Sequence, residues 1–99
     1  MAEYINETEV LQRALDTYGS FLQIAVMMEE MSELQKELCK YLRGKYLLAN
    51  IAEEIADVEI MIAQMKMLFC CADDVHKVRR RKVERMKESL DNGRPNTVI

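Results

Sequence analysis

The sequence has little of what ends or bends regular structure: one proline, three glycines and no tryptophan in 99 residues. It also shows no strand-like alternation of polar and apolar residues, so a loop-rich β-sandwich is excluded, and 49% hydrophobic residues exclude a disordered chain. No apolar run approaches the roughly 18 residues of a membrane span, and the N-terminal MAEYINETEV carries acids where a signal peptide needs bases. These absences predict an all-α protein of the cytoplasm that makes no membrane contact.

Sulfur and imidazole are also scarce. The three cysteines (Cys39, Cys70 and Cys71) form no C-x-x-C pair, and a bond between the adjacent Cys70 and Cys71 would be strained. We therefore expect reduced thiols rather than a disulfide or a zinc site. The single histidine, His76, excludes the paired Glu-x-x-His motifs of a di-iron bundle.

Charge is distributed unevenly along the chain. Residues 1–60 contain 12 acids and 5 bases, a net charge of −7, whereas residues 61–99 contain 5 acids and 9 bases, a net charge of +4. The basic run Val78–Lys82 has no interleaved aromatic residues, and the chain as a whole is acidic at −3. We therefore expect no binding to nucleic acid.

Helix-start signals predict four helices joined by short turns. Three resemble capping boxes, Asn6–Glu9, Ser20–Gln23 and Asn50–Glu53, and an aspartate (Asp73 or Asp74) is suited to cap the fourth helix. The predicted helix ends are Gly19, a point near Gly44, a point near Cys71 and the residue before Asn92. The helices form a single domain over residues 1–94, followed by a tail over 95–99.

The two central helices are predicted to have long apolar faces. At helical spacing, the second helix gathers Ile24, Met27, Met31, Leu34, Leu38 and Leu42, and the third gathers Ile51, Ile55, Val58, Ile62, Met65 and Phe69. Two short flanking helices do not supply enough apolar surface to cover both faces. The sequence therefore predicts a four-helix bundle completed by homo-oligomerisation, as a homodimer or homotetramer.

Carboxylates stand at the edge of these apolar faces, where a charge is costly. Glu30 and Glu33 lie along one edge of the second helix, and Glu54 and Asp57 lie within or beside the apolar sector of the third. Like charges on facing helices raise one another's pKa and destabilise the fold unless a cation compensates them. An all-oxygen site without histidine or cysteine suits Mg²⁺, or alternatively Mn²⁺.

The string Glu29-Glu30-Met31-Ser32-Glu33, followed by Glu54-Ile55-Ala56-Asp57, resembles the E-E-x-x-E…E-x-x-D signature of the MazG-like nucleoside triphosphate pyrophosphohydrolases, an all-α family. The similarity covers Gly19 to about Gln64. It implies Mg²⁺-dependent hydrolysis of a nucleoside or deoxynucleoside triphosphate to the monophosphate and pyrophosphate. It also implies dimers or tetramers with active sites near the subunit interface, and matches Glu30, Glu33, Glu54 and Asp57 to the metal ligands.

The remaining roles follow from the chemistry of triphosphate cleavage. A further carboxylate role, to orient or deprotonate the attacking water, falls to either Glu29 or Glu33. Gln23, on the same edge as Glu30, is a candidate contact to base or sugar. Phosphate-binding candidates lie on the basic fourth helix, foremost Lys77, Arg81 and Arg85. The alternative is a non-catalytic nucleotide-binding or helical interaction module of the same fold.

Overall fold

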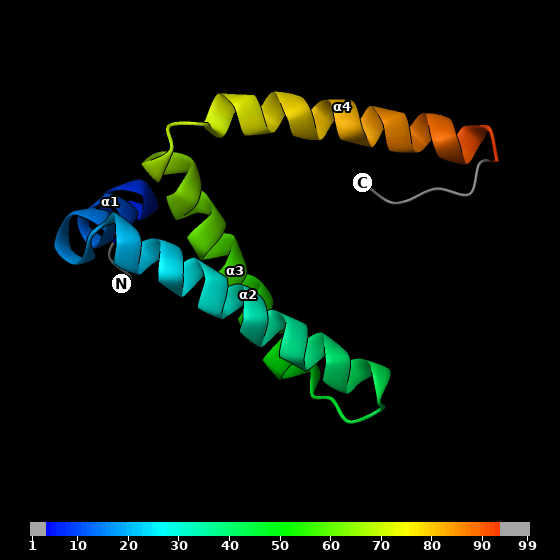
Figure 1. Cartoon of the computed structure of the whole chain (residues 1–99), viewed down its shortest axis with the longest axis horizontal. Helices are drawn as coiled ribbons and strands as arrows, with labels where there is room; N and C mark the ends of the chain where they lie inside the picture. Colours follow the sequence, from blue (N-terminus) through cyan, green and yellow to red (C-terminus); the bar gives the residue numbers. More distant parts are fainter. Residues whose placement is uncertain (1–3, 94–99) are drawn as a thin grey trace. The chain divides into compact units, whose positions relative to one another are not determined.

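The computed structural model describes residues 4–93, which form four α-helices and no strand (Figure 1). The helices are α1 (Glu7–Tyr18), α2 (Ser20–Leu42), α3 (Leu48–Leu68) and α4 (Ala72–Asp91). The predicted all-α class is confirmed for this part of the chain. The chain divides into two compact units, Met1–Phe69 and Cys70–Ile99, and we describe each by itself. The single domain predicted over 1–94 stays a prediction, and the predicted tail lies outside the described residues.

Both predicted ends of α1 are confirmed. The Asn6 side chain accepts a hydrogen bond of 3.2 Å from the backbone N–H of Glu9, which is the geometry of an N-cap. At the other end, Gly19 donates its N–H to the carbonyl of Leu15 at 2.9 Å and has φ of +86°, which is favourable only for glycine. Gly19 alone therefore ends α1 and caps α2.

The other predicted caps are wrong. Ser20 is the first residue of α2 and makes no capping bond, because the preceding Gly19 already holds the cap position. Helix α3 begins at Leu48 with Leu47 as its N-cap, so Asn50 lies within its first turn. Hydrogen bonds from the N–H groups of Asn50 and Ile51 to the Leu47 carbonyl start this helix before the predicted box.

Helix α4 also begins earlier than predicted. Cys71 is its N-cap, and Asp73 and Asp74 lie in the first turn, where the positive end of the helix dipole stabilises their charges. Helix α3 ends at Leu68, with Phe69 as its C-cap, a few residues before the predicted end near Cys71. The predicted end of α4 before Asn92 is confirmed.

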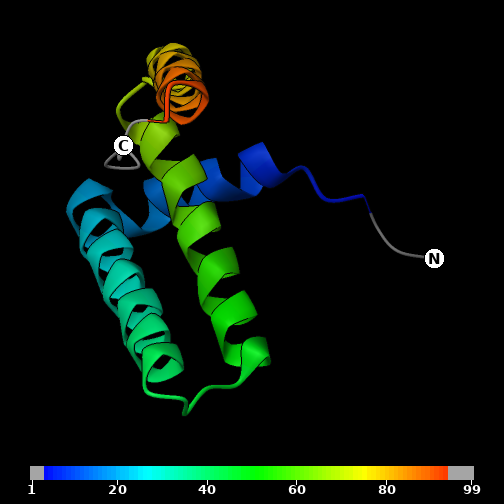
Figure 2. The same cartoon turned by 90° about the vertical axis from the view of Figure 1, so that its right-hand side faces the viewer.

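The first unit is a helical hairpin crossed by a short helix. Helices α2 and α3 run antiparallel side by side, and α1 lies across the end of the hairpin remote from the α2–α3 turn (Figure 2). Leu11 and Leu15 of α1 and Met61 of α3 are its buried apolar residues. The Gln64 side chain is only 2% exposed and donates a hydrogen bond of 3.4 Å to the carbonyl of Leu11, which links α3 to α1.

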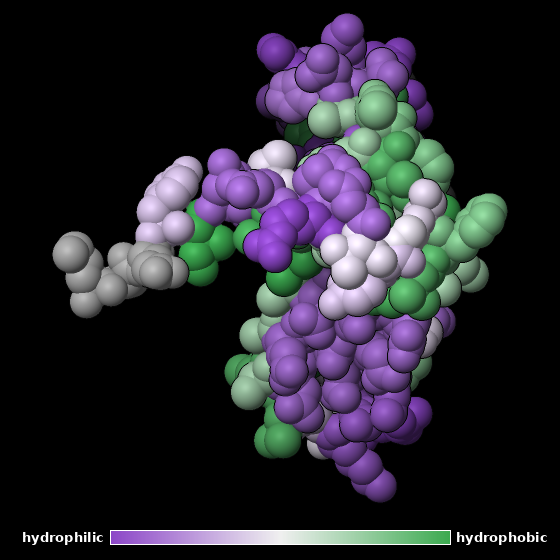
Figure 3. Space-filling model, turned by 90° about the vertical axis from the view of Figure 1, so that its left-hand side faces the viewer, coloured by the Kyte–Doolittle hydropathy of each residue, from purple (hydrophilic) through white to green (hydrophobic). Residues whose placement is uncertain are grey.

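The hairpin is unusual in burying polar residues while apolar ones face outward. Gln23, Glu37 and Gln64 are buried. Six residues predicted to be buried are instead exposed: Met31, Leu38, Leu42, Ile55, Ile62 and Phe69. Figure 3 shows one face of the molecule, where a hydrophilic area covers the turn end of the hairpin and hydrophobic residues lie along its margins. Part of each predicted apolar stripe therefore lies on the surface of the single chain.

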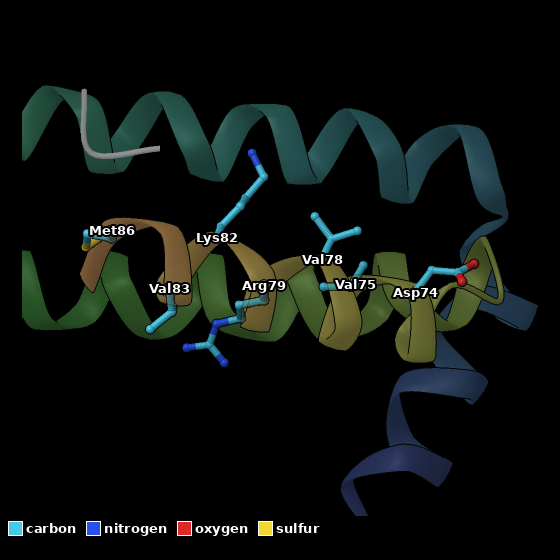
Figure 4. A pocket seen from close by; sticks show the side chains of 7 residues that line it. All are labelled: Asp74, Val75, Val78, Arg79, Lys82, Val83 and Met86. Atoms are coloured by element: carbon cyan, nitrogen blue, oxygen red, sulfur yellow. The ribbon is translucent and has the colours of Figure 1, made fainter. Parts of the chain in front are cut away.

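Helix α4 has a thin apolar side. Val75, Val78, Val83 and Met86, together with Asp74, Arg79 and Lys82, line an open groove of about 510 Å³ (Figure 4). The side chains of Arg79 and Lys82, which line the same groove, point in different directions. No helix among residues 4–93 combines the length and apolar character that a membrane span requires.

The contrast between Asn6 and Ser20 gives a stability test. Asn6→Ala removes the only side-chain cap hydrogen bond seen at a helix start among residues 4–93, and we expect it to lower the free energy of unfolding by about 1 kcal/mol. Ser20→Ala removes an exposed hydroxyl without a capping role, so it should change stability by less than about 0.5 kcal/mol. Urea denaturation at one fixed protein concentration measures both; equal losses would contradict the assigned caps.

Candidate metal centre

Three carboxylates from two helices meet in the middle of the hairpin. Glu30 projects from α2, and Glu54 and Asp57, separated by three residues and so on one face, project from α3. One oxygen of each lies within 4.8 Å of the others, and all three side chains are half-buried. The structure thus brings together three of the four residues predicted as metal ligands.

Burial and the nearby carboxylates make the ionisation of Glu30 and Glu54 unfavourable. The pKa of Glu30 is raised above its usual range by burial, then by the charges of Asp57 and Glu54, and by hydrogen bonding to the Asp57 carboxyl. The pKa of Glu54 is raised by burial, then by the charges of Asp57 and Glu33. Both shifts have the same origin, since negative charge is concentrated where water screens it poorly.

Glu33, the fourth predicted ligand, lies beside the cluster rather than in it. Its side chain is half-buried and its charge acts on Glu54, but no oxygen of Glu33 falls within the three-carboxylate group. Glu29 is exposed, and its charge contributes to the raised pKa of Glu30. Both candidates for activating water therefore border the cluster, and their catalytic role stays a prediction.

Glu37 was not among the predicted metal ligands and belongs to the same surroundings. It is buried, and its charge contributes to the raised pKa of Glu54. Its spacing of seven residues from Glu30, which in turn is seven from Gln23, places all three on one line of α2. That spacing was the signal available in the sequence, because this line forms the buried side of the helix.

The first unit contains buried oxygens without a protein partner, and one of them belongs to the cluster. Among the described residues, Oε2 of Glu54, Oε2 of Glu37 and Oε1 of Gln64 are buried and accept no hydrogen bond. A buried carboxylate oxygen without a donor is costly, and a cation or a donor from a ligand removes that cost. This feature distinguishes the cluster from an acidic patch on a solvated helix face.

The predicted substrate-binding residues belong to two different helices, α2 and α4. Gln23 is buried near the start of α2, which agrees with its place on the Glu30 line but leaves it little exposed surface. Lys77, Arg81 and Arg85 are exposed residues of α4, and none takes part in the ion pairs found among residues 4–93. Arg80, by contrast, is paired with Glu84 at 3.5 Å. Proximity of these α4 cations to the carboxylates stays a prediction.

The donor set determines what the cluster can hold. It consists of carboxylate oxygens, without sulfur or imidazole, which fits a hard divalent cation such as Mg²⁺ or Mn²⁺ rather than zinc. Three ligands from the protein leave coordination positions for water and for phosphate oxygens, as is usual for Mg²⁺ in phosphoryl-transfer sites.

Comparison of this chain with models of known protein families, with curated proteins and with solved structures finds no match. The functional interpretation therefore depends on the residues themselves and on the signature that they form.

The raised pKa values predict how stability depends on pH without metal. Between the ordinary value of 4.5 and the raised values of Glu30 and Glu54, the folded chain binds more protons than the unfolded chain. Stability therefore falls as pH rises through this window and stays low above it. In a chelator at pH 7, Glu54→Gln should melt at a higher temperature than the wild type, and the difference should shrink toward pH 4.5.

The matched control is Glu59→Gln, which neutralises an exposed acid of the same helix and should leave the melting temperature nearly unchanged at both pH values. If both variants behave alike, general relief of negative charge explains the gain and the cluster has no special cost.

Proposed function

We propose that this protein is a Mg²⁺-dependent nucleoside triphosphate pyrophosphohydrolase, which converts a nucleoside or deoxynucleoside triphosphate and water into the monophosphate and pyrophosphate. The observation that carries the proposal is the three-carboxylate group of Glu30, Glu54 and Asp57, with a buried and unpartnered oxygen on Glu54. The E-E-x-x-E…E-x-x-D spacing that supplies these residues supports the same conclusion.

The residues present fit a magnesium site. Glu30, Glu54 and Asp57 would hold the ion, and Glu33 and Glu37 lie near enough for their charges to act on Glu54. Magnesium held by these residues would neutralise charge on the phosphate oxygens and fix them in place. The cost of collecting these carboxylates in a half-buried position is then offset by the ion that they bind.

The chain's own residues supply the proton transfer. Glu29 or Glu33, at the border of the cluster, accepts a proton from water as the water oxygen bonds to the α-phosphorus. The bond from that phosphorus to the oxygen bridging the α- and β-phosphates breaks, and its electron pair leaves with pyrophosphate. Gln23 is proposed to contact the nucleoside, and Lys77, Arg81 and Arg85 the phosphates, from the same or a neighbouring chain.

The exposed apolar stripes support the proposed homo-oligomer. Met31, Leu38, Ile55 and Ile62 are exposed on the two helices that carry the carboxylates. Apolar surface of this kind is commonly covered in a subunit interface. Association of hairpins into a MazG-like bundle, as a dimer or tetramer, would bury these residues and leave the carboxylates at the edge of the interface.

A direct assay tests the activity. Purified protein with Mg²⁺ and a panel of ribo- and deoxyribonucleoside triphosphates should release monophosphate and pyrophosphate in equal amounts. Glu54→Gln removes one charge from the metal group and should reduce kcat/KM at least about 100-fold, which corresponds to about 2.7 kcal/mol of transition-state stabilisation.

Glu59→Gln is the control and should retain the wild-type rate. Release of inorganic phosphate and the nucleoside diphosphate would refute the proposed position of cleavage. A folded protein that melts at a higher temperature with Mg²⁺ and nucleotide, but cleaves none of the panel, would favour a binding module over an enzyme.

The homo-oligomer has its own test. Ile62→Glu places a charge in the exposed apolar stripe of α3 and should shift the sedimentation equilibrium from dimer or tetramer toward monomer. Glu59→Lys changes charge by a larger amount at an exposed polar position and should leave the assembly intact. A wild type that sediments as a monomer at micromolar concentration would contradict the assembly.

A further inference from the structure

A second site adjoins the carboxylates at the turn end of the hairpin. A pocket of about 430 Å³ opens there, formed within the first unit by the end of α2, the turn and the start of α3. Its lining residues are Glu37, Lys40, Arg43, Gly44, Lys45, Tyr46, Leu47 and Asn50. Its charge is opposite in sign to that of the carboxylate cluster.

Cations of the first unit are concentrated around this pocket. Residues 4–69 contain six lysines and arginines, and three of them, Lys40, Arg43 and Lys45, line it. Lys40 is paired with Glu37 at 3.2 Å, whereas Arg43 and Lys45 take part in none of the ion pairs found among residues 4–93. The pocket therefore has two positive charges that are not balanced by its single carboxylate.

The N-terminus of α3 adds partial positive charge to the same pocket. Leu47, at the N-cap, provides no side-chain hydrogen bond, and the first turn contains no acidic residue. An uncapped helix N-terminus presents unsatisfied N–H groups and the positive end of the helix dipole, both of which favour an oxoanion. Leu47 and Asn50 belong to this turn and line the pocket.

Glu37 supplies an independent sign of a ligand. Its side chain is 9% exposed and lines the pocket, and only Oε1 is satisfied, by Lys40. Oε2 is buried and has no partner among the described residues. A ligand that brings both an oxoanion and a cation would complement the two unpaired cations and the Glu37 carboxylate together. Magnesium-complexed phosphate does so, since it carries an oxoanion and a cation with bound water together.

We propose that this pocket binds the β- and γ-phosphates of the triphosphate and retains them as magnesium pyrophosphate after cleavage. The inference rests on the proposed function. It also specifies the orientation in which the triphosphate binds along the hairpin. Asn50 precedes Glu54 by four residues, about 6 Å along α3, so the pocket begins one helical turn from the carboxylates. The terminal phosphates lie toward the α2–α3 turn, and the nucleoside lies toward Gln23 and α1.

Binding of magnesium pyrophosphate, measured by calorimetry, tests the pocket without turnover. The double variant Arg43→Gln/Lys45→Gln should weaken this binding at least tenfold and leave binding of nucleoside monophosphate within twofold. The control Arg13→Gln/Lys36→Gln removes the same charge from exposed positions outside the pocket and should leave both affinities unchanged. Equal weakening by the two double variants would overturn the pocket as the phosphate site.

Glu37→Gln separates the role of the carboxylate from that of the cations. It should weaken pyrophosphate binding only when Mg²⁺ is present, and an equal effect in chelator would overturn the role given to Oε2. The inference and the proposed function fail in different ways. If the wild type hydrolyses triphosphate and pyrophosphate inhibits the Arg43→Gln/Lys45→Gln variant as strongly as the wild type, the pocket alone is overturned. Pyrophosphate binding that depends on Arg43 and Lys45, without hydrolysis of any triphosphate, would support the pocket and overturn the enzyme.

Discussion

Mutual repulsion among carboxylates between α2 and α3 is the constraint on which the hairpin depends. Glu30, Glu54 and Asp57 each bring an oxygen to within 4.8 Å of the others, and Glu33 and Glu37 add charge nearby. In the folded chain, burial and like charge both favour the protonated forms of Glu30 and Glu54. The negative charges of these groups therefore destabilise the folded chain unless a bound cation compensates them.

This arrangement also explains the distribution of apolar residues. Because the inner line of α2 contains Gln23, Glu30 and Glu37, the hairpin cannot place its apolar stripes wholly inward as well. Met31 and Leu38 on α2 consequently remain on the surface of one chain. Because polar residues occupy the inside of the hairpin, apolar surface remains outside, and we propose that another subunit covers it.

The sequence predicted the parts of this structure that depend on local spacing. The helix-start signal at Asn6 was sufficient because a side chain and a backbone N–H three residues apart complete the cap by themselves. The same pattern failed at Ser20 and Asn50, where Gly19 and Leu47 begin the helices earlier. A capping-box sequence indicates which hydrogen bonds can form at a helix start. The conformation of the preceding turn determines which residue becomes the N-cap.

The candidate site shows the same division. The spacing of Glu54 and Asp57 placed both on one face of α3, and the signature linked them to Glu30. Glu37 was not assigned to the site although its spacing puts it on the line of Gln23 and Glu30, because its burial depends on how α2 packs against the rest of the hairpin. The pocket at the turn was not predicted either, since Lys40, Arg43 and Lys45 look like ordinary surface cations until the turn brings them around one space.

The joint between α1 and α2 consists of one residue, Gly19, and this has a consequence for how the chain tolerates changes in length. Inserting one residue into a helix rotates everything beyond it by about 100°. At this joint, an insertion or deletion would turn Leu11, Leu15 and the carbonyl bonded to Gln64 away from their contacts. The longer turn between α2 and α3 offers more residues over which to absorb such a change, so length variation should be tolerated unequally at the two ends of the same hairpin.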